Sequence, residues 1–316
     1  MAGRHSFAQL RARMTPKARA KAEAEALRLE EEMNLAEVRR ALKLSQDEIA
    51  QTLQIGQGSV AKIEKREAVD NLESILEVAD GVMVARGDLG VEMPTEEVPT
   101  LQKQIIRKAN QRGRLVITAT QMLESMVGHP RPTRAEASDV ANAIIDGTDA
   151  IMLSGETAIG LYPIAAVATM SRIAVYTESH LEVEPWRLRN ESPVQDGTKI
   201  SRAVAAAARR AAQQLKARYV AVFTESGATA RLVSHSRPDS PILAFTPYER
   251  VYRRLALRWG VRPVLAQHYD TTDEMVDAEM RWIRDHHLVQ QGDVVVIVCG
   301  TTTLSGATNM VKVHQF

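Results

Sequence analysis

The chain has 316 residues, of which 45% are hydrophobic and 25% charged, and its formal net charge is +1. These values are typical of a globular protein with two or three domains, and they exclude a disordered chain and one that is strongly basic or acidic throughout. No apolar run approaches the length of a membrane span, no secretory signal opens the chain, and a single cysteine, Cys299, excludes an intrachain disulfide. We therefore expect a cytoplasmic protein without a membrane segment, in which Cys299 is a buried apolar residue.

Residues 1–33 are expected to form a basic arm followed by a solvated helix. Thr15 and Pro16 make a helix start, and segment 17–33 is rich in Ala, Glu, Arg and Leu without Gly or Pro. Residues 1–66 contain 13 Lys and Arg against 9 Asp and Glu, so they carry +4 and leave −3 for the rest. This distribution weakly favours an anionic partner at the N-terminus.

The next segment has the spacing of a helix-turn-helix. Three helices are predicted, over residues 34–44, 45–53 and 57–66. The spacing resembles the Cro/repressor-type helix-turn-helix of antitoxin-like proteins, and we assign residues 1–67 to this domain. In such domains the second helix of the motif lies in the major groove, which implies DNA contacts by Gln57, Ser59 and Lys62. The alternative is a small helical bundle without a DNA-binding role.

From Ala68 the sequence changes to alternating strands and helices. Strands are predicted over residues 81–86, 115–119 and 150–153, and helices over 71–78, 96–112, 133–146 and 164–178. Apolar strands separated by helices indicate a parallel sheet with both faces covered. Polar residues just past the strand ends line the active site in such folds, and the candidates are Asp88, Thr120, Ser154 and Glu156.

Five segments of this region resemble pyruvate kinase. They are Met-Val-Ala-Arg-Gly-Asp-Leu-Gly (83–90), Ala-Thr-Gln-Met-Leu-Glu-Ser-Met (119–126), Pro-Arg-Pro-Thr-Arg-Ala-Glu (130–136), Ser-Asp-Val-Ala-Asn (138–142) and Ile-Met-Leu-Ser-Gly-Glu-Thr-Ala (151–158). The resemblance runs from about Val60 to the C-terminus. It implies an incomplete (β/α)8 barrel over residues 68–182, with only the last three or four strands, and a C-terminal α/β domain over residues 195–316.

The resemblance implies phosphoryl transfer between phosphoenolpyruvate and ADP, yielding pyruvate and ATP. In that chemistry Lys62 would stabilise the transferring phosphoryl group, and Glu64 and Asp88 would hold Mg²⁺, whose preferred ligands are carboxylate oxygens. The family also uses K⁺, but its ligands belong to the first half of the barrel, which the sequence lacks. Without the family context, Lys62 and Glu64 would be an ordinary solvated pair.

The remaining site residues are also assigned through the resemblance. The amides around Gly87 and Asp88, together with Thr120, would bind the substrate carboxylate. Thr120 is counted among the catalytic residues with Lys62. Ser154 and Glu156 would belong to the proton relay that acts on the enolate.

The C-terminal region resembles the regulatory domain of pyruvate kinase. Helices are predicted over 200–215, from Glu249 and over 273–286, and strands over 219–223, 242–245, 262–265 and 293–299. The loop after the first of these strands resembles one that binds a phosphorylated effector through backbone amides and hydroxyls, and its residues are Thr224, Ser226, Gly227 and Thr229. Residues 300–306 could close over this loop. The alternative is a plain turn.

Val60–Glu64 receives two conflicting predictions, a recognition helix from the preceding residues and a barrel strand from the following ones. We expect it to stay helical, because no strand is predicted before it. Three functions therefore compete. The first is a truncated pyruvate-kinase-type phosphotransferase that is inactive as a lone chain and associates with itself or with an intact pyruvate kinase. The second is a DNA-binding regulator with a metabolite-sensing body, and the third is a fusion without a selected role.

Overall fold

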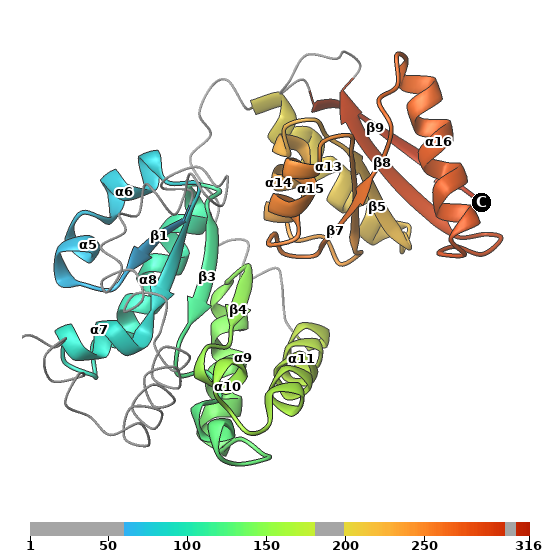
Figure 1. The fold of residues 1–316 in the computed structure, drawn as a ribbon. Helices are drawn as coiled ribbons and strands as arrows, with labels where there is room; N and C mark the ends of the chain where they lie inside the picture. Colours follow the sequence, from blue (N-terminus) through green and yellow to red (C-terminus); the bar gives the residue numbers. More distant parts are fainter. Residues whose placement is uncertain (1–59, 181–198, 301–307) are drawn as a thin grey trace, which may run out of the picture. The chain divides into compact units, whose positions relative to one another are not determined.

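The computed structural model describes residues 60–180, 199–300 and 308–316, which form two sheets with flanking helices (Figure 1). The helices predicted between residues 17 and 53 lie outside this part of the chain, as do Gln57 and Ser59. The described helices include none that is long and apolar enough to cross a membrane.

The first sheet has four parallel strands in the order β1-β2-β3-β4. The strands are β1 (Val60–Ile63), β2 (Gly81–Ala85), β3 (Leu115–Ala119) and β4 (Ala150–Met152). The helical segments around them are α5 (Arg66–Asp70), α6 (Leu72–Val78), α7 (Arg86–Glu92), α8 (Val98–Gln111), the 3₁₀ turn η1 (Glu124–Val127), α9 (Arg134–Asp146), α10 (Gly155–Ala158) and α11 (Pro163–Ser179). The predicted parallel sheet is thus confirmed. Segment 87–90, expected only to end a strand, lies within helix α7.

The prediction that Val60–Glu64 stays helical is wrong. This segment begins the sheet, and β1 pairs with β2 in a parallel register that sets Lys62 opposite Met83. Ile63 is fully buried against the core formed with Leu72 and Val82. Pairing with β2 and burial of Ile63 therefore outweigh the local helical pattern. Lys62 lies on a strand and so is not a recognition-helix contact to DNA.

Local sequence signals set the position of α9. Thr133 accepts a hydrogen bond from the Glu136 amide at 3.2 Å while the Glu136 carboxylate accepts from the Thr133 amide at 2.7 Å, which is a complete capping box. Gly147 ends the helix at a φ of 99°, in the left-handed region that favours glycine. The helix packs on α11 through Val140, Ala143 and Ile144.

The second sheet has the order β7-β6-β5-β8-β9, and only β9 is antiparallel to its neighbour. Its strands are β5 (Tyr219–Phe223), β6 (Ile242–Thr246), β7 (Val261–Leu265), β8 (Val294–Gly300) and β9 (Thr308–Gln315). Its helices are α13 (Lys199–Gln214), α14 (Ala228–His235), α15 (Glu249–Leu255) and α16 (Thr272–Asp285). The sequence analysis did not anticipate α14 and β9.

Two cores cover the two faces of this sheet. One includes alanines of α13, such as Ala205 and Ala208, with Val233 of α14. The other joins α16 to Phe245 and Cys299, and Cys299 is buried as predicted. The first sheet and the second thus each have their own hydrophobic core, as separate domains require.

Candidate functional site

Lys62, Glu64 and Asp88 form a three-residue charge cluster at the carboxyl end of β1 and β2. The Lys62 ammonium forms ion pairs with the Glu64 carboxylate and with Asp88 Oδ2, the latter at 2.7 Å. All three side chains remain between 33% and 50% exposed, so the cluster is open to solvent. Burial alone would lower the pKa of Lys62, but hydrogen bonds and charges from Asp88 and Glu64 outweigh it and raise the pKa above 10.5. Lys62 is therefore a permanent cation at neutral pH.

The two carboxylates of this cluster suit a divalent cation that also binds phosphate. Because Glu64 and Asp88 both contact the ammonium of Lys62, their oxygens converge on one point. Mg²⁺ is usually held in proteins by one or two carboxylates, with water and substrate phosphates completing its coordination. Among the described residues no group of three acidic, histidine or cysteine side chains is placed to hold a metal ion. The donor set thus fits Mg²⁺ shared with a phosphate better than a metal bound by protein alone.

Thr120 and Gly87 meet at the ends of β3 and β2. Thr120 Oγ1 accepts a hydrogen bond from the Gly87 amide at 2.8 Å and donates to the Ala119 carbonyl at 2.7 Å. A Cβ on Gly87 would lie 3.4 Å from that hydroxyl, at the limit of ordinary van der Waals contact. The structure therefore brings together two residues assigned to the substrate carboxylate, with the Gly87 amide bonded to Thr120.

The backbone around Thr120 is strained. Thr120 and Gln121 have φ values of 65° and 53°, which are uncommon for any residue except glycine and unfavourable for a β-branched one. Strain of this kind persists only where surrounding contacts hold it, and it clusters at functional sites.

Arg86 supplies those contacts, and the sequence analysis missed it. Its guanidinium is 7% exposed and donates to the Thr120 carbonyl at 2.8 Å and to the Gln121 carbonyl at 2.8 Å. It also forms an ion pair with Asp139 of α9. The arginine inside the Met-Val-Ala-Arg segment was a visible signal, because a charged residue directly after a buried strand requires a partner.

Ser154 and Glu156 follow β4. Glu156 is 1% exposed, and its carboxylate accepts from the Leu123 amide at 2.9 Å and the Ser154 amide at 2.8 Å. The Ser154 hydroxyl is buried and has no hydrogen-bond partner in the described part of the chain. Glu156 thus joins the loops after β3 and β4. No hydrogen bond or ion pair links Ser154 or Glu156 to Lys62 within residues 60–180.

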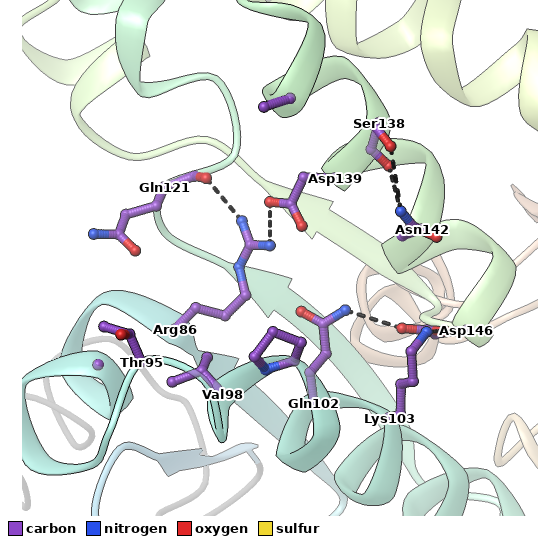
Figure 2. A pocket seen from close by; sticks show the side chains of 13 residues that line it. Arg86, Thr95, Val98, Gln102, Lys103, Gln121, Ser138, Asp139, Asn142 and Asp146 are labelled. Atoms are coloured by element: carbon purple, nitrogen blue, oxygen red, sulfur yellow. Dashed lines mark hydrogen bonds and ion pairs between the residues drawn. The ribbon is translucent and has the colours of Figure 1, made fainter.

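A cavity of about 600 Å³ lies beside this region, lined mainly by residues of α7, α8 and α9 (Figure 2). Figure 2 shows the Arg86 guanidinium between Gln121 and Asp139, whereas Lys103 and Gln102 both point to Asp146. The cavity does not include Lys62, Glu64 or Asp88. Its cations are neutralised by its own acids, so Arg86 connects the cavity to the Thr120 loop without supplying an open charge.

The candidate effector loop precedes α14. Thr224 Oγ1 accepts from the Gly227 amide at 2.9 Å, and Gly227 has a φ of 84°. Thr229 is buried, and its hydroxyl bonds that of Thr308 at 2.7 Å. Ser226 remains exposed. The loop is thus held in a defined turn, and Ser226 is its accessible hydroxyl. Residues 301–306, expected to close over it, lie outside the described residues.

Comparison with protein families gives two matches. The family model described as "Pyruvate kinase, barrel domain" matches residues 30–167, and that described as "Pyruvate kinase, alpha/beta domain" matches residues 202–314. The first match includes residues 34–66, which the sequence analysis assigned to a helix-turn-helix.

Several curated proteins are similar to the chain. The pyruvate kinase of Clostridium acetobutylicum is 49% identical over 255 residues, which are 80% of this chain and 54% of that protein. The pyruvate kinase of Geobacillus stearothermophilus is 52% identical over 256 residues, 81% of this chain and 43% of that protein. The pyruvate kinase of Sporosarcina psychrophila is 48% identical over 285 residues, which are 88% of this chain and 47% of that protein. The chain spans about half the length of the curated relatives it matches.

Proposed function

Because the chain belongs to the pyruvate kinase family over the two matched regions, we propose that its first sheet supplies the metal and phosphoryl part of a phosphotransferase site. The reaction would transfer a phosphoryl group between phosphoenolpyruvate and ADP. The observation that supports this function best is the convergence of Glu64 and Asp88 on the Lys62 ammonium. Such transfer depends on positioning and on neutralising charge, which this cluster can provide.

In this proposal Lys62 stabilises negative charge on the transferring phosphoryl oxygens. Its raised pKa keeps it protonated throughout the working range of pH, and it needs no proton exchange to act. Glu64 and Asp88 would hold Mg²⁺, which supplies charge neutralisation and alignment of the phosphate when bound. The family also implies K⁺, for which we assign no ligand among the described residues.

The substrate carboxylate would bind at Gly87, Asp88 and Thr120. Arg86 holds the strained Thr120 loop in place, so we assign it a positioning role. The Ser154 hydroxyl is buried without a partner and is held beside the Glu156 carboxylate through the Ser154 amide. We assign Ser154 Oγ to the movement of the proton that reaches the enolate carbon.

We further propose that the 316-residue chain has little activity alone. The described residues provide four parallel strands, and a barrel of this type closes with eight. The remaining strands of the barrel would come from a second copy of the chain or from an intact pyruvate kinase.

A coupled pyruvate-release assay tests this proposal. Purified chain is assayed with Mg²⁺, K⁺, phosphoenolpyruvate and ADP, alone and after mixing with an intact pyruvate kinase whose own lysine has been inactivated. We expect little turnover alone, and turnover in the mixture that is lost in Lys62→Met. Full turnover by the lone wild-type chain would contradict the incomplete barrel, and turnover that survives Lys62→Met would contradict the assigned site.

We also propose that the loop of Thr224, Ser226, Gly227 and Thr229 binds a phosphorylated effector. The accessible Ser226 hydroxyl and the turn at Gly227 support this role. Ser226→Ala should abolish the effect of a sugar phosphate on turnover in the mixture described above. An unchanged response would show that the loop is only a turn.

A further inference from the structure

Four arginines of the C-terminal domain lie close enough to act on one another electrostatically. They are Arg202 of α13, Arg231 of α14, Arg254 of α15 and Arg258 in the turn after α15, and together they are called the arginine cluster. Figure 1 shows α13, α14 and α15 grouped against the second sheet. The Ser234 hydroxyl donates to the Trp259 carbonyl at 2.7 Å and fixes α14 against that turn. The cluster therefore rests on packed elements.

Three members of the arginine cluster lack an acidic partner. Arg254 is 3.1 Å from Asp80. Within the described residues, however, no hydrogen bond or ion pair engages the side chain of Arg202, Arg231 or Arg258, and Nε of Arg202 is buried without a partner. The two buried arginines of the described residues, Arg86 and Arg237, are each paired with an acid. Arg86 is paired with Asp139, and Arg237 with Asp149 at 3.2 Å.

The surrounding charges do not balance the arginine cluster. Burial together with the charges of Arg114, Arg254 and Arg202 lowers the pKa of Arg231. Among the described residues, the acids that act on Arg231 and Arg258 are Asp80 and Asp149, and each is already ion-paired with an arginine.

Neighbouring groups add no negative charge. Arg114 donates to the carbonyls of Leu76 and Glu77. Burial and the nearby arginines lower the pKa of His235 to about 4, so it is neutral at pH 7. Leaving several cations partly desolvated without counter-charge is unfavourable, and a bound anion would remove this cost.

We propose that the arginine cluster binds a small phosphate-bearing anion between α13, α14 and α15. Guanidinium groups match phosphate geometry through paired N–H donors, and three unpartnered guanidiniums can satisfy a group with two negative charges and three acceptor oxygens. Arg231 is exposed and Arg202 and Arg258 are half-buried, so an anion can reach them. This inference does not rest on phosphotransfer activity.

This site is distinct from the loop at residues 224–229. Thr229 and Arg231 are two positions apart on α14, which places their side chains about 200° apart around the helix. Thr229 faces Thr308 of β9, whereas Arg231 faces Arg202 and Asp80. The two faces of α14 would therefore serve separate anions.

Titration of the full chain with inorganic phosphate at constant ionic strength tests the proposal, by calorimetry and by thermal melting. We expect saturable binding that raises Tm, weakened at least tenfold in Arg231→Gln and in Arg258→Gln. The matched control is Arg253→Gln, because Arg253 is exposed on α15 and already paired with Glu249. Ser226→Ala should lose only binding at the loop of residues 224–229 and keep the phosphate binding that the arginine variants lose.

In phosphate-free buffer Arg231→Gln should keep or raise Tm, because it removes repulsion among cations. Three results would overturn the proposal. They are absence of phosphate binding to the wild-type chain, loss of binding in Ser226→Ala but not in the arginine variants, and a lowered Tm in the arginine variants with unchanged phosphate affinity. The last would show a purely structural role.

Discussion

Glu279 gives the sharpest stability prediction, because it is a carboxyl group buried in an apolar core. It lies on α16, is 2% exposed, and neither carboxylate oxygen has a partner in the described part of the chain. Burial raises its pKa from 4.5 to about 8. The charge of Glu279 acts on the Cys299 thiol, whose pKa burial raises to about 12, so the thiol stays neutral. Lys312 of β9 also acts on that thiol.

The sign of the effect follows from proton uptake. Between pH 4.5 and 8 the folded state holds a proton on Glu279 that the unfolded state has released, so stability falls as pH rises through this window. At 1.36 kcal/mol per pH unit, we expect a loss of about 3 kcal/mol between pH 5.5 and 8, on top of other groups. Glu279→Gln cannot ionise and should not show this loss, and Glu279→Met should be more stable at both pH values because its side chain suits the apolar site.

Urea unfolding at pH 5.5, 7 and 8 measures this difference. Trp282, on the same helix, packs edge-to-face on Phe245 with ring centroids 5.4 Å apart, so its fluorescence reports on this core. Asp277→Asn is the matched control, since Asp277 is exposed on α16 and should retain the wild-type pH dependence. If wild type and Glu279→Gln lose stability equally from pH 5.5 to 8, the reasoning is refuted.

Three further predictions concern the first sheet. Ile63→Ala should lower the free energy of unfolding by about 3 kcal/mol in urea titrations, since Ile63 is fully buried in β1; a change below about 1 kcal/mol would contradict the strand. Arg86→Met should lower the free energy of unfolding by about 3 kcal/mol, because it leaves Asp139 and the carbonyls of Thr120 and Gln121 without their partner. An unchanged urea midpoint would exclude the anchoring role of Arg86. Glu136→Gln should lose stability at neutral pH but little at pH 3. Burial alone would raise the pKa of Glu136, but hydrogen bonds from Ser125 and Thr133 outweigh it and lower the pKa. The stability that these hydrogen bonds give is therefore lost as pH falls and the carboxylate is protonated. A loss of stability in Glu136→Gln that does not depend on pH would contradict this.

The sequence predicted the strands of both sheets well where they are buried on both faces. Val82 and Val84 of β2 and Val295, Val296 and Val298 of β8 are fully buried, so an apolar run with flanking turn residues identified these strands. It failed at β9, where Lys312 and His314 interrupt the apolar pattern and the antiparallel pairing with β8 decides the structure. It failed at β1 because the pairing partner, β2, follows about 20 residues later in the chain.

The candidate site was only partly accessible to sequence reasoning. Strand ends identified Asp88, Thr120 and Ser154, since parallel strands bring these positions to one edge. The hydroxyl contact between Thr120 and Gly87, the left-handed backbone at Thr120 and the anchoring by Arg86 depend on three-dimensional packing. The arginine cluster was missed for the same reason, because its members lie on separate elements that only the fold brings together.

The central claim is that Lys62 of β1, Glu64 directly after it and Asp88 of α7 form one metal and phosphoryl site. Binding of Mn²⁺, followed by electron paramagnetic resonance on the purified chain, tests it most directly. We predict a site that is weakened in Glu64→Gln and in Asp88→Asn but strengthened in Lys62→Met, because the ammonium then no longer competes for the two carboxylates. Glu67→Gln, exposed on α5, should match wild type. Equal Mn²⁺ affinity in all four variants would contradict the account.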